Sequence, residues 1–146
     1  MKESLKPGIK FEFKFEVPPN KTVPDLLPES PEFQQMPRVL ASGFMVGLIE
    51  WTCIQALNPY LDWPREQSVG IGFYLDHAAP TPPGLTVSIR IELIKVEGRK
   101  LTLAVEADDG IDKITAGTHE RFVIDAARFK AKAEAKLSKA LGGGNG

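Results

Sequence analysis

The first regular pattern in the chain is a strict alternation of hydrophobic and charged positions. Over residues 10–17, Phe11, Phe13, Phe15 and Val17 are separated by lysine and glutamate residues. A period of two places successive side chains on opposite faces of an extended backbone. The pattern therefore predicts an antiparallel strand with one buried face.

A proline-rich segment follows over residues 18–38. It carries six of the twelve prolines in the chain, so we expect neither regular helix nor sheet there. Its apolar residues, which include Phe33 and Met36, argue against disorder. A connection of this length in a small domain is typical of a functional loop, and we expect it to pack as a lid over another part of the molecule.

An apolar helix is predicted over residues 43–57, ended by Asn58 and Pro59. Ser42 precedes it and is suited to cap the first turn, because its hydroxyl can accept a hydrogen bond from a free backbone N–H group. Hydrophobic residues cover most of the circumference of this helix. We therefore expect other elements to surround it.

The rest of the chain is predicted to form strands and one final helix. Apolar periodicity and turn residues predict strands over residues 68–76, 85–96, 100–108 and 113–124. Tight turns are expected around Glu97 and Gly98 and over residues 108–110. An alanine- and lysine-rich helix is predicted over residues 126–141, and the glycines within residues 142–146 indicate a frayed tail.

These elements combine into a single α+β domain over residues 1–146. Strands joined mostly by hairpins do not favour a parallel, doubly wound sheet. A curved antiparallel sheet wrapped around the apolar helix would enclose it, and this arrangement is the hotdog fold. By analogy with that fold, we expect a homodimer formed through sheet edges.

Composition and charge narrow the classes of function. Eighteen basic and nineteen acidic residues give a net charge of −1, without the basic excess that general nucleic-acid binding needs. The longest apolar stretch, residues 43–57, contains Glu50 and is too short to span a bilayer. No apolar run follows the N-terminus, and Cys53 is the single cysteine. We therefore expect a cytoplasmic protein without disulfides and without nucleic-acid or membrane partners.

Glu50 is the most informative candidate for chemistry, because a carboxylate in the middle of an apolar helix is costly to bury without a partner. One interpretation is a structural ion pair with an arginine such as Arg121. The other is a catalytic carboxylate, and we favour it.

Two histidines and one serine complete the set of candidates. His77 ends a predicted strand before a rigid turn, which suits either a surface role or catalysis. His119 lies in strand phase with Arg121, and we predict it on the polar face and not in the core. Ser42 at a helix N-terminus lies beside N–H donors that would stabilise an oxyanion, so capping and nucleophilic roles can coexist, and Gly43 leaves that approach open.

Three further residue types are less specific. Gly70 and Gly72 interrupt a predicted strand, which indicates either a bend or a close approach of the backbone to a ligand. Cys53 is interpreted as a small buried hydrophobic residue. No metal site is predicted, since two histidines and one cysteine show no closely spaced ligand pattern.

Four sequence blocks carry a family resemblance. They are residues 28–33 (PESPEF), 41–51 (ASGFMVGLIEW), 81–87 (TPPGLTV) and 117–121 (GTHER). In this order they resemble the fluoroacetyl-CoA thioesterase family of hotdog proteins, over residues 22–129. The resemblance implies hydrolysis of a short acyl-CoA to the free acid and CoA, with CoA as part of the substrate and no separate cofactor.

The resemblance also implies roles for individual residues. The family's catalytic threonine, glutamate and histidine match Ser42, Glu50 and His77. Its glycine near the substrate carbonyl matches Gly70, and its arginine near the end of the last strand matches Arg121. In one route His77, supported by Glu50, deprotonates Ser42 for attack, and in the other Glu50 itself attacks the thioester or activates water.

Two positions depart from the family pattern. Serine at position 42 keeps the hydroxyl and loses the methyl group that restricts its rotamer. In the lid, Phe33 is kept, but Met36 replaces a second phenylalanine, and a flexible thioether tolerates more acyl shapes than a ring. The resemblance thus supports thioester hydrolysis more than fluoroacetyl selectivity. A non-catalytic acyl-CoA binding protein and a hydratase on the same fold are the alternatives.

Overall fold

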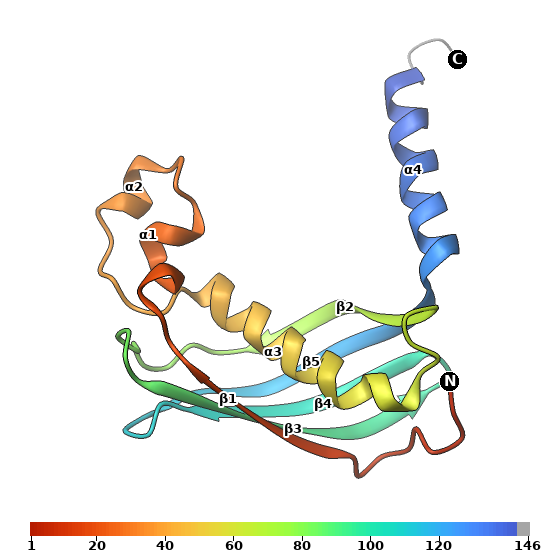
Figure 1. Ribbon diagram of the computed structural model, residues 1–146, viewed down its shortest axis with the longest axis horizontal. Coiled ribbons are helices and arrows are strands. Elements are labelled where there is room, and N and C mark those ends of the chain that lie inside the picture. Colours follow the sequence, from red (N-terminus) through yellow and green to blue (C-terminus); the bar gives the residue numbers. More distant parts are fainter. Residues whose placement is uncertain (143–146) are drawn as a thin grey trace.

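The structure, a computed structural model, describes residues 1–142 as a curved five-stranded antiparallel sheet with one long helix in its hollow (Figure 1). The strands lie in the order β1-β3-β4-β5-β2. Their bounds are Lys10–Glu16 for β1, Glu66–Leu75 for β2, Thr86–Glu97 for β3, Lys100–Asp108 for β4 and Lys113–Asp125 for β5. The expected hotdog architecture is confirmed.

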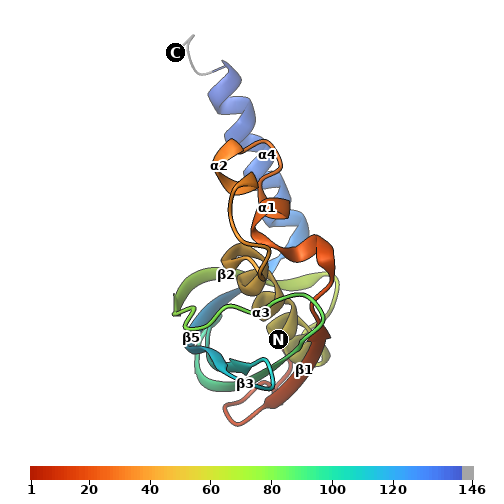
Figure 2. The same cartoon turned by 90° about the vertical axis from the view of Figure 1, so that its left-hand side faces the viewer.

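Helix α3 (Ser42–Leu57) fills the hollow of the sheet, as the end-on view in Figure 2 shows. Its buried apolar side chains are Met45, Leu48, Ile49, Cys53, Ala56 and Leu57, and they join a core of buried β3 and β4 residues. Each large side chain buried there contributes about 1.5–3 kcal/mol to the free energy of unfolding. The sheet surrounds α3 as expected, although Trp51 is still 46% exposed in the single chain.

The lid contains short helices, which corrects the expectation of irregular backbone alone. They are η1 (Pro19–Lys21), α1 (Val23–Leu26) and α2 (Pro31–Gln34). Each of these helices has a proline in its first turn, where no backbone N–H is needed, so the prolines are compatible with helix there.

Side chains brace the lid internally. Thr22 and Asp25 form a capping box at the start of α1. Ser30 caps α2 by accepting a hydrogen bond from the backbone N–H of Phe33 at 3.1 Å. The Gln34 side chain donates to the Pro24 carbonyl at 2.9 Å and ties the two helices together. The lid is therefore a folded unit at the N-terminal end of α3 (Figure 1).

Most element bounds fall within one or two residues of the prediction. Helix α3 is followed by a short helix, η2 (Asn58–Tyr60), and β2 begins at Glu66, two residues earlier than expected. The final helix, α4 (Ala126–Gly142), includes Gly142, which was expected in a frayed tail. The other residues of that tail, 143–146, lie outside the described part of the chain. None of the helices within residues 1–142 is long and apolar enough to cross a membrane.

Strand β2 forms one edge of the sheet and, within residues 1–142, pairs only with β5. Its register shifts between Gly70 and Gly72, so the predicted bend is a bulge. Large apolar side chains are exposed along this edge, with Tyr74 63% exposed beside Ile71 and Phe73. An exposed, unpaired edge with apolar side chains is a surface suited to association.

Candidate active site

Ser42 and His77 form a hydrogen-bonded pair at the N-terminal end of α3. The Ser42 hydroxyl lies 2.7 Å from His77 Nδ1. Ala41 is the N-cap residue and Ser42 is already the first residue of the helix, so the prediction that Ser42 caps α3 is wrong. Its hydroxyl is used by the histidine instead of by the first-turn backbone.

His77 follows the end of β2 and has the surroundings of a base. Partial burial lowers the pKa of its imidazole below the ordinary value of 6.5, and the charge of neighbouring Asp76 only partly opposes this effect. The ring is therefore neutral near pH 7, with Nδ1 free to accept the Ser42 proton. Its other nitrogen, Nε2, is buried and has no hydrogen-bond partner within residues 1–142.

A cavity of about 300 Å³ opens at this pair. Its lining comes from the lid, from the start of α3 and from the segment after β2: Val23, Val39, Leu40, Ser42, His77, Ala78, Ala79 and Pro80. Apart from Ser42 and His77 these side chains are apolar. The cavity therefore suits a small acyl group next to a hydroxyl and a base.

Arg121 organises a second cluster, where β5, β2 and α3 meet. This buried guanidinium donates through Nε to the Ser68 hydroxyl at 2.8 Å and through Nη2 to the Ser68 carbonyl at 2.6 Å. Through Nη1 it donates to Glu50 Oε2 at 3.0 Å. The ion pair with Arg121 that we considered for Glu50 thus exists, but the Glu50 side chain is 35% exposed and not buried.

His119 belongs to this cluster, and its predicted place on the polar face is wrong. It is fully buried beside Arg121, because the same face of β5 that carries Arg121 turns inward under α3. Phe122, on the opposite face of β5, is exposed. The signal in the sequence was the combination of this shared strand phase with the Glu50–Arg121 ion pair considered above, which would have turned both residues toward α3.

The contacts of His119 define its tautomer. Its Nε2 lies 2.9 Å from Arg121 Nη1, and because a guanidinium nitrogen can only donate, Nε2 is the acceptor. The proton is therefore on Nδ1, which donates it to the Gly72 carbonyl at 2.8 Å. Burial lowers the pKa of this imidazole first of all, and the nearby Arg121 charge lowers it further. His119 is therefore a neutral support, stacked on Phe73 with ring centroids 4.3 Å apart.

Gly70 allows β2 to approach this cluster closely. A Cβ atom at position 70 would lie 2.8 Å from Glu50 Oε2 and 3.2 Å from His119 Cε1. The bare glycine is thus needed for the position that Glu50 takes. The backbone at Gly70 thus approaches the Glu50 carboxylate closely, while the approach to a ligand expected for this glycine stays a prediction.

One chain does not bring all candidates together. Glu50 lies eight residues along α3 from Ser42, a rise of about 12 Å, so the carboxylate and the Ser42–His77 pair are separate within the chain. Phe33 is half-buried in α2 and Met36 is exposed, and neither lines the cavity at Ser42. A Cβ at Gly43 would lie 2.6 Å from the Leu26 side chain, so this glycine makes room for the lid.

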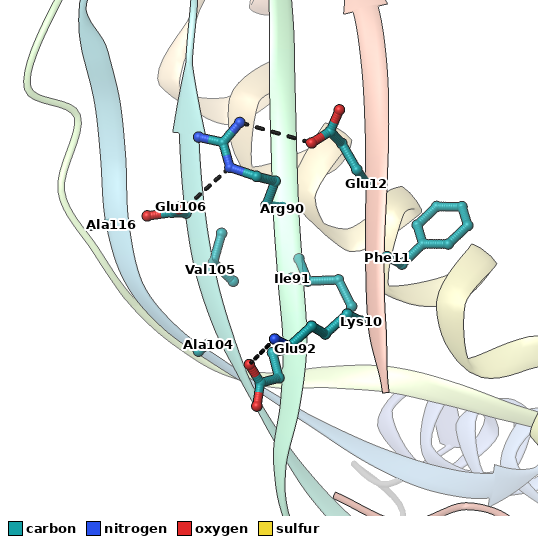
Figure 3. A pocket seen from close by; sticks show the side chains of 10 residues that line it. All are labelled: Lys10, Phe11, Glu12, Arg90, Ile91, Glu92, Ala104, Val105, Glu106 and Ala116. Atoms are coloured by element: carbon teal, nitrogen blue, oxygen red, sulfur yellow. Dashed lines mark hydrogen bonds and ion pairs between the residues drawn. The ribbon is translucent and has the colours of Figure 1, made fainter. Parts of the chain in front are cut away.

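A larger cavity, about 540 Å³, lies elsewhere (Figure 3). It faces away from α3, on the outer side of the sheet, and contains none of the predicted site residues. Its charged side chains are already paired, with Arg90 bonded to Glu106 and Lys10 close to Glu92. Its size alone therefore does not make it the active site. Within residues 1–142, no group of three or more His, Cys, Asp or Glu side chains is arranged to hold a metal ion.

Comparison with known proteins identifies the family. The family model described as fluoroacetyl-CoA-specific thioesterase matches residues 23–127. The chain belongs to this thioesterase family. The fluoroacetyl-CoA thioesterase of Streptantibioticus cattleyicolor is 52% identical over 136 residues, which cover 93% of this chain and 97% of that protein.

Solved structures agree with this assignment to the fluoroacetyl-CoA-specific thioesterase family. A threonine-to-serine mutant of a fluoroacetyl-CoA thioesterase, in complex with acetyl-CoA, is 53% identical with a TM-score of 0.88, covering 90% of this chain and 98% of that chain. A thioesterase superfamily member from Thermus thermophilus is 24% identical with a TM-score of 0.81, covering 94% and 96% of the two chains. The latter likeness shows the hotdog fold alone.

Proposed function

We propose that this protein hydrolyses the thioester of a short-chain acyl-CoA, releasing the free acid and CoA. The single observation that carries the proposal is the Ser42–His77 hydrogen bond of 2.7 Å, at the mouth of a small apolar cavity, in a chain of the fluoroacetyl-CoA-specific thioesterase family. A hydroxyl bonded to a neutral imidazole is the arrangement that nucleophilic acyl transfer requires. This pair also disfavours a purely binding role.

The chemistry follows from the position of Ser42. His77 Nδ1 accepts the Ser42 proton while Oγ attacks the thioester carbonyl, and the C–S bond breaks to release CoA as the thiol after it regains that proton. The N–H groups in the first turn of α3 have no partners inside the helix and can stabilise the developing oxyanion. Water activated by His77 then hydrolyses the acyl-serine to the free acid.

The family resemblance assigns Glu50 to the same catalytic site as His77, but a single chain does not bring the two side chains together. The buried His77 Nε2 has no partner among the described residues, while Glu50 lies about 12 Å along α3 from Ser42. We infer a homodimer paired through the β2 edges, in which Glu50 of one copy supports His77 of the other. The exposed apolar side chains of β2, Ile71, Phe73 and Tyr74, support such a contact.

For the acyl group of the substrate, we propose a short chain and no further selectivity. The lid carries Phe33 and the exposed Met36, and a flexible thioether restricts the shape of a bound acyl group less than an aromatic ring does. We therefore expect hydrolysis of several short acyl-CoA thioesters and not strict selection of fluoroacetyl-CoA.

The test is thiol release from acetyl-, fluoroacetyl-, propionyl- and phenylacetyl-CoA by the purified protein. We expect turnover with at least one of them and a fall of kcat by about 10²–10⁴ in His77→Ala and Glu50→Gln. Ser42→Ala should lose a similar factor if Ser42 is the nucleophile. Near-normal turnover of Ser42→Ala would instead favour the route through Glu50.

Two outcomes would contradict the proposal. Tight binding of the CoA esters without thiol release would indicate a binding protein. Hydration of an enoyl-CoA, seen as a change in absorbance without thiol release, would indicate a hydratase.

A further inference from the structure

Within residues 1–142, the C-terminal helix α4 packs on its own chain only at its base, beside β5. None of its residues is buried, and it projects away from the sheet (Figures 1 and 2). Most of the stability of a helix in a protein comes from packing of its apolar face, so tertiary contacts are expected along the 17 residues of α4. The element therefore needs a surface outside its own chain.

The two sides of α4 differ in chemistry. Phe129, Leu137 and Leu141 are exposed and separated by multiples of four residues, so they form one apolar stripe. A basic ridge lies beside it, one residue earlier in the helical repeat, at Arg128, Lys132 and Lys136, and Lys139 lies two residues before Leu141. With five basic residues and one acidic residue, α4 presents an apolar stripe flanked by positive charge.

The lid has the complementary character. The lid, residues 18–38, contains three acidic side chains, Asp25, Glu29 and Glu32, and two basic ones near its ends, Lys21 and Arg38. Leu27 and Met36 expose apolar surface on the same segment. The lid thus offers negative charge and apolar contacts to a basic amphipathic helix.

The lid and α4 of one chain lie at opposite ends of α3. The lid leads directly into the first residue of α3, whereas the base of α4 is tied to the segment after η2 by a hydrogen bond from Ala126 N to the Arg65 carbonyl at 2.9 Å. A helix of 16 residues, about 24 Å, separates the two ends. Both elements rise on the side of the molecule where β2 has its free edge (Figure 1).

A two-fold axis through that edge exchanges the two ends. Antiparallel pairing of two β2 strands places the α4 end of one chain beside the lid end of the other. We propose that α4 is an arm that packs on the lid of a second copy of this chain, with the basic ridge against the acidic lid. This inference rests on the dimer and the active site proposed above, and it makes the partner's arm part of the cover over Ser42 and His77.

Cross-linking in the full-length chain tests the contact directly. Glu32→Cys and Lys136→Cys are combined in one chain and treated with a short bismaleimide, while native Cys53 is fully buried. We expect a covalent dimer on a denaturing gel. The matched control replaces Lys136→Cys by Ser138→Cys, which points about 200° away on the helix and should yield several-fold less dimer.

A second measurement reverses charges on α4 and follows the proteolysis of the lid. Lys132→Glu with Lys136→Glu should make the lid several-fold more sensitive to thermolysin at Leu26 and Leu27, and adding Glu29→Lys with Glu32→Lys should restore protection. The same charge change away from α4, Lys6→Glu with Lys95→Glu, should leave lid cleavage unchanged.

The proposed packing of α4 on the lid is overturned if the Lys136→Cys and Ser138→Cys pairs cross-link equally. It is also overturned if the charge changes on α4 and those at Lys6 and Lys95 have the same effect on lid cleavage. It is also overturned if α4 binds phosphatidylserine vesicles through Lys132 and Lys136 and no cross-link forms, since α4 would then be a membrane-surface helix. Cross-linking needs no turnover, so a cross-linked dimer without thiol release would contradict the proposed function alone. An active enzyme without the cross-link would contradict the arm alone.

Discussion

At the level of single residues, the contact with Arg121 decides how far Glu50 can be both a structural ion-pair partner and a catalytic carboxylate. It holds Glu50 Oε2 at 3.0 Å, so the carboxylate is paired, yet the Glu50 side chain remains partly exposed and can still meet a second group. Removing a buried arginine with this many hydrogen bonds typically costs about 3–5 kcal/mol, because its partners stay buried without a donor. Structural pairing and catalysis are therefore compatible at Glu50.

The neutral His119 predicts how stability depends on pH. Burial lowers the folded-state pKa of His119, while in the unfolded chain it protonates near 6.5. Below that pH the unfolded chain binds more protons, so the free energy of unfolding falls as pH decreases, by at most about 1.4 kcal/mol per pH unit for one such group. Denaturant unfolding from about pH 7.5 to about pH 5.5, at fixed protein concentration, measures this loss.

His119→Gln is the control for this prediction. Glutamine can still accept from Arg121, but it does not titrate. The loss of stability on acidification should be smaller in this variant, while the part due to His77, whose pKa is also lowered, should remain. An unchanged pH dependence in His119→Gln would refute the role assigned to His119.

At the level of elements, the bulge in β2 sets the position of the Glu50 carboxylate on α3. The register shift between Gly70 and Gly72 brings bare backbone against Glu50, and no larger residue fits there without displacing the carboxylate or His119. Strand and helix thus position Glu50 together, although they are distant in the sequence.

Gly70→Ala should therefore reduce activity more than it reduces stability. Its Cβ would lie 2.8 Å from Glu50 Oε2, and we expect kcat to fall about tenfold or more as the carboxylate moves. The cost in the free energy of unfolding should be about 1–3 kcal/mol, the usual effect of overpacking. Thiol release and denaturant unfolding of the same samples check both numbers.

Gly72→Ala is the matched variant on the same strand. Its Cβ would meet the side chains of Glu120 and Tyr74, whose ends can move. We expect near-normal kcat from this variant. Equal losses in the two variants would mean that the bulge acts on the strand as a whole and not on Glu50.

At the level of the whole molecule, the separation of Glu50 from His77 predicts complementation between subunits. Glu50→Gln and His77→Ala should each be inactive as homodimers. When they are mixed, unfolded and refolded together, half of the dimers are mixed, and each has one site with both wild-type residues. About a quarter of the wild-type thiol release should return.

No recovery in the mixture would place Glu50 and His77 of one chain in the same site. Sedimentation of the wild-type protein is the accompanying control, since a monomer at micromolar concentration would exclude any shared site. The cytoplasmic location expected from the sequence stays a prediction.

Local patterns predicted most of the elements. Alternation of hydrophobic and charged residues over 10–17 indicated β1, and the apolar run after Ser42 indicated α3, because period and side-chain type depend on neighbours in the sequence. The resemblance of four blocks also placed the chain in its family. The face of β5 was predicted wrongly, because polar His119 and Arg121 turn inward where Ser68, Gly72 and Glu50 supply partners from other elements.

The sequence by itself determined the hotdog class, the lid segment and the residue types of the site. Only the tertiary structure decided that Ser42 bonds to His77 instead of capping its helix, and that Glu50 pairs with Arg121. The reason is physical: a strand or helix arises from interactions between near neighbours, whereas a hydrogen bond between residues 35 or 71 positions apart depends on how the sheet curves around α3.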